Sequence, residues 1–213
     1  MKRLWPGWLL CGLTAVLLVY MAAFEARDIS CTIDGIPLPD AVITGYDQDA
    51  ARTLYDAFTD ELAQAEAAGR ESASAAYVSM HAGSDLLFPP MLAASLAFLA
   101  FAGLNARAPG GAVPPSAKIL LGLTFAVAFT YLGFDYVENA VADALFGPAS
   151  LKLPLNTDLV PVLRVLTIGK YAAIALAAAL ILSLWIGAWR SKRARHTNAT
   201  PAAGAARDPD HSE

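Results

Sequence analysis

The chain has 213 residues, of which 56% are hydrophobic and only 16% are charged. Charged residues make up about a quarter of a typical soluble domain, so this composition argues against an ordinary soluble protein and favours a membrane protein. The formal net charge of −4 conceals a strongly uneven distribution of acidic and basic residues, which carries information about orientation.

Four apolar stretches are long enough to cross a bilayer, whose core of about 30 Å needs about 20 residues of helix. They are apolar on all sides rather than along one stripe, as expected for helices surrounded by lipid. They cover residues 8–24, 86–104, 119–138 and 165–189. We therefore predict an all-α fold, an integral membrane bundle of four transmembrane helices in residues 1–189 with a small α-helical extracytoplasmic cap in the loop 25–85.

The first span has two interpretations. Lys2 and Arg3 precede the apolar run and small residues follow it, as in a secretory signal peptide. The run is longer than the roughly 7 to 15 apolar residues of such a signal, which favours a retained anchor. Cleavage, which would leave three spans, stays an open alternative.

A helix is predicted within the long loop, from a capping aspartate at Asp47 or Asp49 to about Ala68. Its apolar positions recur at intervals of three and four residues, which places them on one stripe that should face the bundle. These positions are Ala51, Leu54, Tyr55, Phe58, Leu62 and Ala65. The charged residues, Glu61 among them, are expected on the opposite, solvated face.

Basic and acidic residues indicate the orientation. Residues 25–85 contain twelve acidic residues and three basic ones. Because basic residues near span ends stay on the cytoplasmic side, both termini should be cytoplasmic, in the cell inner (plasma) membrane, with the long loop outside. The tail, residues 190–213, is basic and then rich in Ala and Pro, and we expect it to be disordered. The basic residues at the cytoplasmic ends are Lys2, Arg3, Arg107, Lys118, Arg190, Lys192, Arg193 and Arg195.

Ionisable residues inside spans cost about 2.5–3.5 kcal/mol each on insertion scales, so each needs a partner or a role. The third span ends in Asp135, Glu138 and Asn139, whose i, i+3, i+4 spacing places them on one helical face. Lys170 lies in the fourth span at a depth close to that of Asp135, roughly 6 to 9 Å below the outer surface of the core. We therefore predict an ion pair between Asp135 and Lys170.

Two more charged residues reach this level. Asp85 opens the second span, and Arg164, at the outer edge of the fourth, is expected to lie nearer to Glu138. The cluster is either a structural latch or a binding site for a cation, a proton or a polar headgroup, and both interpretations stay open. Lys170 in the same cluster argues against a metal ion. His81 is interpreted as a loop residue.

Several short motifs occur in a fixed order: Gly45-Tyr46, Gly69-Arg70, Tyr77, D-x-x-F-P from Asp85, D-x-x-E-N from Asp135, and Lys170. In this order they resemble a family of uncharacterised bacterial four-span membrane proteins. The chain departs from that pattern in a longer segment between Gly45 and Gly69. The resemblance implies four spans and an outer polar cluster with cap contacts from Arg70 and Tyr77, and it implies no activity.

Motifs for a catalytic nucleophile, a zinc protease or a phosphate-binding loop do not occur in the sequence, so we expect no catalytic residue, metal or cofactor, and no binding to nucleic acid. We predict a non-enzymatic binding or accessory protein whose outer polar pocket holds membrane lipid, an ion, a membrane protein partner or a second copy of the chain. The alternative is a small ion- or proton-linked transporter that uses Asp135, Glu138 and Lys170.

Overall fold

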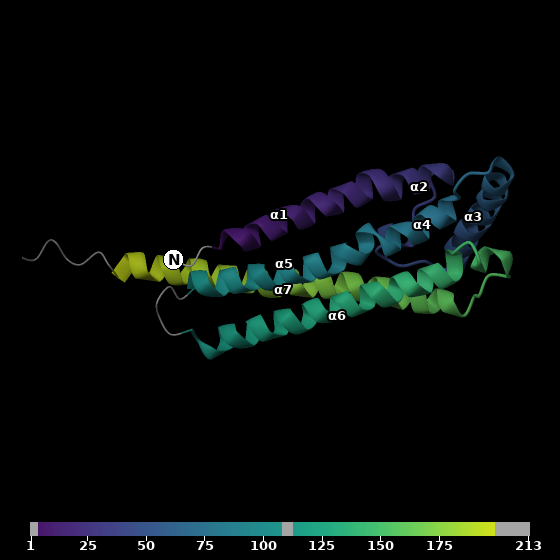
Figure 1. Cartoon of the computed structure of the whole chain (residues 1–213). Coiled ribbons are helices and arrows are strands. Elements are labelled where there is room, and N and C mark those ends of the chain that lie inside the picture. The colour runs from purple at the N-terminus through teal and green to yellow at the C-terminus, as the bar shows by residue number, and fades with distance from the viewer. Residues whose placement is uncertain (1–3, 108–112, 199–213) are drawn as a thin grey trace, which may run out of the picture.

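A computed structural model describes residues 4–107 and 113–198, the side chains of 194–198 excepted. All regular elements in these ranges are helical (Figure 1), which confirms the predicted all-α fold. Four helical segments are long and apolar enough to cross a membrane, and each contains one predicted span, so the chain is a multi-pass membrane protein. They are Trp5–Thr32, Ala73–Arg107, Pro115–Lys152 and Leu159–Arg193.

The bundle has a three-helix centre and one peripheral helix. Helices α5 (Ser84–Arg107), α6 (Pro115–Phe146) and α7 (Leu159–Asn198) pack against one another. Helix α1 (Trp5–Tyr20) packs mainly against α5, and it continues without a break through a π-helical turn (Met21–Glu25) into α2 (Ala26–Thr32). Helix α7 extends beyond the expected end of the fourth span at residue 189, and the remainder of the predicted tail, residues 199–213, lies outside the described residues.

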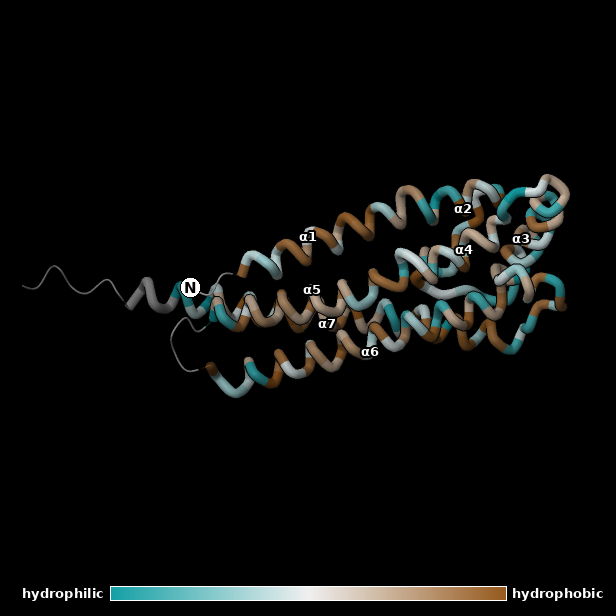
Figure 2. Tube along the Cα trace, in the orientation of Figure 1, coloured by the Kyte–Doolittle hydropathy of each residue, from teal (hydrophilic) through white to brown (hydrophobic). Residues whose placement is uncertain are grey.

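The two ends of the bundle differ. Helices α2, α3 (Gln48–Ala68) and α4 (Ala73–Ala82) gather at one end, which we call the cap end, while α1 begins and α7 ends at the opposite end, which we call the tail end (Figure 1). Hydrophilic residues concentrate at the cap end, and hydrophobic residues dominate the long helices (Figure 2). Exposed apolar side chains such as Val16, Phe129 and Leu182 cover the outside of the long helices, where lipid would surround them.

Helix α3 begins and ends as its sequence predicts. Asp47 accepts a hydrogen bond from the Ala50 amide at 2.8 Å, which caps the first turn. Gly69 ends the helix with a positive φ of 64°, and the Arg70 amide bonds to the Ala65 carbonyl at 3.1 Å. The predicted apolar stripe faces the bundle: all its residues are buried except Tyr55, which is partly buried.

The prediction for Glu61 was wrong, because this side chain is buried rather than solvated. One carboxylate oxygen lies 2.5 Å from the Arg70 guanidinium. The other accepts the Ala73 amide at 2.7 Å, in the first turn of α4. Glu61 therefore joins the two cap helices. Helix α4 itself was not predicted; Ser72 caps it by accepting from the Ala75 amide at 3.1 Å.

A segment without long helices connects α2 to α3 and reaches into the bundle. This segment, residues 33–47, contains a single short 3₁₀ turn, Pro39–Ala41, and we call it the strap. Gly45 has a φ of +67°, and a Cβ there would lie 2.7 Å from Arg164 Cγ and 2.9 Å from the Arg164 carbonyl oxygen. Arg164 in turn donates from Nε to the Thr44 carbonyl at 3.3 Å. The strap is thus docked closely on α7.

Two apolar cores lie at different heights in the bundle. The cap-end core includes Phe58, Tyr77 and Phe146. Its side chains come from the cap helices, the strap, the last turns of α6 and the first turns of α7. The tail-end core consists mostly of Ala and Leu from α5, α6 and α7, such as Ala100 and Leu184. The small alanines among these residues allow membrane helices to approach closely. Buried polar side chains occupy the level between the two cores, and they form the candidate site.

Candidate functional site

Lys170 is the centre of the buried polar cluster. Its Nζ lies 3.3 Å from Asp135 Oδ1 and 3.1 Å from Asp40 Oδ1, and it also pairs with Glu138. The ion pair that the sequence predicted between Asp135 and Lys170 is therefore present in the structure. It is one of three, and the lysine side chain is only 8% exposed. One lysine ammonium is therefore shared by three carboxylates, and it donates a hydrogen bond to Asp40.

Helix α6 supplies most of the acidic side. Asp135, Glu138 and Asn139 share one face, as their spacing predicted, and all three are buried. Glu138 does not turn toward Arg164 as expected; it pairs with Lys170 and accepts a hydrogen bond from Thr167 Oγ1 at 2.5 Å. The reason is depth: Arg164 is exposed one and a half turns nearer the cap, where it binds the strap.

Asp85 belongs to the same cluster, on the α5 side. Its Oδ2 accepts a hydrogen bond from Asn139 Nδ2 at 2.7 Å, and the aspartate is 6% exposed. Asn139 Oδ1 has no hydrogen-bond partner among the described residues, and neither does Asp135 Oδ2, which is likewise buried. Glu138 Oε2 also has no hydrogen bond there, but it is paired with the Lys170 ammonium. Asn139 Oδ1 and Asp135 Oδ2 therefore lack both kinds of contact among the described residues.

Asp40 comes from the strap, and no pattern in the sequence predicted that it would enter the bundle. Tyr77 donates to its Oδ2 at 3.1 Å, and Tyr171 donates to its backbone carbonyl at 2.5 Å. Burial alone would raise the pKa of Asp40, but the charges of Lys170 and His81 outweigh burial and hold that pKa well below its usual value. Asp40 is therefore a stable anion in the cluster.

His81 is not a loop residue, contrary to its interpretation from the sequence. It lies in α4 and is buried, with Nδ1 2.6 Å from Asp143 Oδ1 and Nε2 3.6 Å from Asp40 Oδ2. Polar groups thus extend continuously from the partly exposed Asp143, through His81 and Asp40, to Lys170. Of the two expected cap contacts, Tyr77 reaches the cluster through Asp40, while Arg70 binds Glu61 within the cap.

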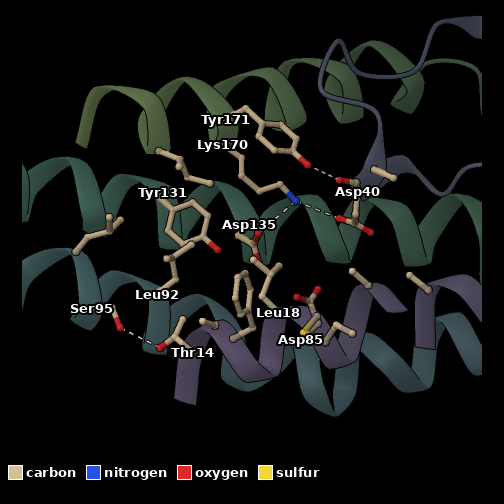
Figure 3. A pocket seen from close by; sticks show the side chains of 18 of the residues that line it. Thr14, Leu18, Asp40, Asp85, Leu92, Ser95, Tyr131, Asp135, Lys170 and Tyr171 are labelled. Carbon is tan, nitrogen blue, oxygen red and sulfur yellow. Dashed lines mark hydrogen bonds and ion pairs between the residues drawn. The ribbon is translucent and has the colours of Figure 1, made fainter. Parts of the chain in front are cut away.

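A cavity of about 620 Å³ lies beside this cluster, between α1 and the centre of the bundle. Most of its wall is apolar, with Leu18, Leu92 and Ile174 as examples, while Asp40, Asp85, Asp135 and Lys170 face it on one side (Figure 3). The wall formed by α1, the π-helical turn and the start of α2 runs from Cys11 to Ala26, which is about 22 Å at 1.5 Å per residue. The cavity is therefore long and apolar, with its charges concentrated in one region.

Helix α1 is fixed on both sides of this cavity. Near the tail end, a Cβ on Gly7 would lie 2.1 Å from the Phe98 ring, and Trp8 packs edge-on against the same ring at 5.3 Å. Near the cap end, Ser84 donates a hydrogen bond to Glu25. Between these two contacts, α1 touches α5 through the 2.9 Å bond that joins Thr14 and Ser95 (Figure 3). The separation between α1 and α7 that leaves the cavity open is thus built into the packing.

Comparison with models of known protein families, with curated proteins and with solved structures gave no match.

Proposed function

We propose that this protein binds an amphipathic, lipid-like molecule within the membrane. The apolar chain of the ligand would occupy the cavity along α1, and its polar group would meet the charged cluster. The observation that carries this proposal is the combination of a long apolar cavity with buried charges that line one part of it. Ligand sites commonly have volumes of about 300–1,000 Å³, apolar walls and a few convergent polar groups, and this cavity has all three features.

The composition of the cluster favours a binding site over a purely structural latch. A latch between α6 and α7 needs one carboxylate beside Lys170, but four carboxylates gather here, those of Asp40, Asp85, Asp135 and Glu138. Leaving a buried acceptor unsatisfied costs about 1–3 kcal/mol, and ionisable groups at membrane depth are commonly functional. A ligand that supplies donors to the free oxygens would remove this cost.

The tail-end core favours binding over ion or proton transport. A transporter that uses the Asp, Glu and Lys cluster needs a polar path to each side of the membrane. From the cap end, such a path exists as far as Lys170, through Asp143, His81 and Asp40. Toward the tail end, the centre of the described bundle is packed with residues such as Ala100, Ala177 and Leu184. The site is thus connected to one side.

In the proposed orientation, the cap end lies on the extracytoplasmic side of the cytoplasmic membrane and both termini lie in the cytoplasm. It is supported by the acidic excess in residues 25–85 and by the basic residues at the tail end. The ligand would then come from the outer leaflet, between α1 and α7. The family resemblance implies four spans with an outer polar cluster, which agrees with this proposal. It does not indicate which ligand is bound.

Mass spectrometry of the intact protein, purified in mild detergent, tests the proposal. Ala22 and Ala23 are neighbouring exposed residues of the π-helical turn, and Ala22 lines the cavity whereas Ala23 does not. Ala22→Trp should fill the space and lower the occupancy of co-purifying amphiphile by about tenfold. The matched variant Ala23→Trp should leave occupancy unchanged. Equal occupancy in both variants, or no bound amphiphile on the wild-type protein, would reject a ligand site in the cavity.

A further inference from the structure

The hydrogen-bonding capacity of the cluster restricts which polar group the ligand can carry. Among the described residues, Lys170 is the one cation that lines the cavity, and it is already paired with Asp40, Asp135 and Glu138. A phosphate, sulfate or carboxylate on a ligand would therefore compete with three carboxylates for the same ammonium group. An anionic headgroup would also have to displace one of these carboxylates from the lysine.

The groups that remain available are acceptors. Asp135 has a side chain that is 5% exposed, it lines the cavity, and its Oδ2 has no hydrogen-bond partner in the described residues. Asp85 also lines the cavity and accepts one bond from Asn139, through Oδ2. Figure 3 shows both aspartates beside the cavity, with Asp135 close to Lys170 and Asp85 near Leu18 of α1. A ligand group placed between them can bind both by donating hydrogen bonds to these oxygens.

The charges agree with this geometry. Three carboxylates share Lys170, and Asp85 lies beside them on Asn139. His81 is shared between Asp40 and the more peripheral Asp143. Excess negative charge at this depth is unfavourable unless protonation or a cation neutralises it. An ammonium group supplies both the positive charge and the N–H donors that the free carboxylate oxygens need.

We infer that the ligand of this cavity carries a primary amine in its ammonium form, which donates to Asp135 and Asp85 while its apolar chain lies along α1. This inference rests on the proposed function, because it assumes that the cavity takes an amphiphile. The amine belongs either to a membrane aminolipid or to a free amphiphilic amine, and the recognition chemistry is the same for both.

Cys11 provides a reporter for the test. It lines the cavity and is partly buried, whereas Cys31, the other cysteine of the chain, is exposed. In full-length protein carrying Cys31→Ser, in uncharged detergent, the rate of Cys11 alkylation by N-ethylmaleimide should fall when a ligand fills the cavity. The probes are dodecylamine, dodecanol, dodecyl phosphate and dodecyltrimethylammonium, which share one chain length and differ in the head. Native mass spectrometry counts the bound probe independently of the thiol.

Dodecylamine should protect Cys11 at concentrations about tenfold or more below those of the other three probes. Asp85→Asn and Asp135→Asn should each remove most of this preference while protection by dodecanol stays unchanged. Asp49→Asn, at an exposed cap position, serves as the control and should keep the full preference. The Asp85 variant leaves all three Lys170 contacts in place, so the test does not depend on the folding of the Asp135 variant.

The outcomes separate the two proposals. If no probe protects Cys11 and none is counted by mass spectrometry, the ligand cavity itself is rejected. If dodecanol or dodecyl phosphate matches the amine, the cavity stands and the ammonium inference fails. In phosphatidylcholine vesicles, protection that requires added phosphatidylethanolamine supports a membrane aminolipid as the source, and protection that requires added dodecylamine supports a free amine.

Discussion

Asp40 Oδ1 lies 3.1 Å from Lys170 Nζ although the two residues are 130 positions apart in the sequence. Asp40 belongs to the strap between α2 and α3, and Lys170 belongs to a membrane-spanning helix. The contact therefore connects the cap to the polar level of the bundle. Since the strap also supplies Leu38 and Ala41 to the cavity wall, the same segment closes the cap side of the ligand site.

Asp40→Asn should weaken the docking of the strap, and the resulting loss of stability should vary little with pH. The charges of Lys170 and His81 hold the pKa of Asp40 far below its usual value. The stability from a carboxyl group with a lowered pKa is present above its unfolded value, near 3.9, and is lost only as the pH falls through the lower folded value. We expect the variant to lose about 1.5–3 kcal/mol, with a nearly constant difference from wild type between about pH 5 and pH 8. Thermal unfolding in detergent across that range measures this. A difference that disappears already at pH 5 would contradict an ionised Asp40.

Gly45→Ala should destabilise the docked strap more than Gly35→Ala. Both glycines have positive φ, +67° and +79°, so each substitution carries a backbone strain of about 1–2 kcal/mol. A Cβ at position 45 would also meet the Arg164 backbone within 3 Å, whereas a Cβ at position 35 has nothing within 4 Å. The melting temperature should therefore fall further for Gly45→Ala, and its strap should be cut faster by a protease. Equal effects of the two variants would mean that the strap does not dock closely on α7.

Glu61→Ala should be costly, whereas Glu66→Ala on the same helix should be nearly neutral. Glu61 is buried and holds both Arg70 and the Ala73 amide. Removing it leaves a partner unsatisfied, which costs about 1–3 kcal/mol. Glu66 also forms an ion pair, with Lys152 at 3.0 Å, but both side chains are more than half exposed, and such pairs contribute about 0–1 kcal/mol. Thermal unfolding of the two variants compares them directly, and a larger loss for Glu66→Ala would contradict the packing of the cap.

Elements with a local signal could be predicted from the sequence. The spans follow from length and hydrophobicity, and α3 follows from its capping Asp47, its apolar stripe and the terminating Gly69. The Asp135–Lys170 pair followed from comparing depths along two helices of known direction. These inferences needed only helical geometry and the cost of leaving a charge alone in lipid.

Residues placed by tertiary docking could not be predicted in the same way. The strap has no periodicity, so nothing in the sequence indicated that Asp40 would reach Lys170. Two other residues of the polar network did show a pattern in the sequence. His81 lies four residues after Tyr77 and four before Asp85, and Asp143 lies four residues after Asn139. Such intervals indicate a shared helical face, and extending both faces toward the cap would have brought His81 and Asp143 into the cluster.

Reporter fusions test the proposed orientation of the bundle. The acidic cap and the basic tail end predict that a fusion at Ala68 reports the exterior. Fusions within residues 105–117 and at the C-terminus should report the cytoplasm. A reporter that is active only in the cytoplasm and a second that is active only outside it should give opposite patterns at each position. A C-terminus found outside would contradict four spans that begin in the cytoplasm.

Lys170 and Asp135 should behave as an unequal pair, because one cation serves three carboxylates. Lys170→Met leaves all three acids without their cation, and breaking a buried ion pair from one side costs about 3–5 kcal/mol. Asp135→Leu leaves Lys170 with Asp40 and Glu138, so its cost should be smaller, about 1–3 kcal/mol. The double variant removes one of the stranded acids and should therefore lose less than the sum of the two single variants. Thermal unfolding of the wild-type protein and these three variants in detergent, read as a double-mutant cycle, measures the coupling. Strictly additive losses, or a loss for Asp135→Leu as large as that for Lys170→Met, would show that the lysine is not shared in this way.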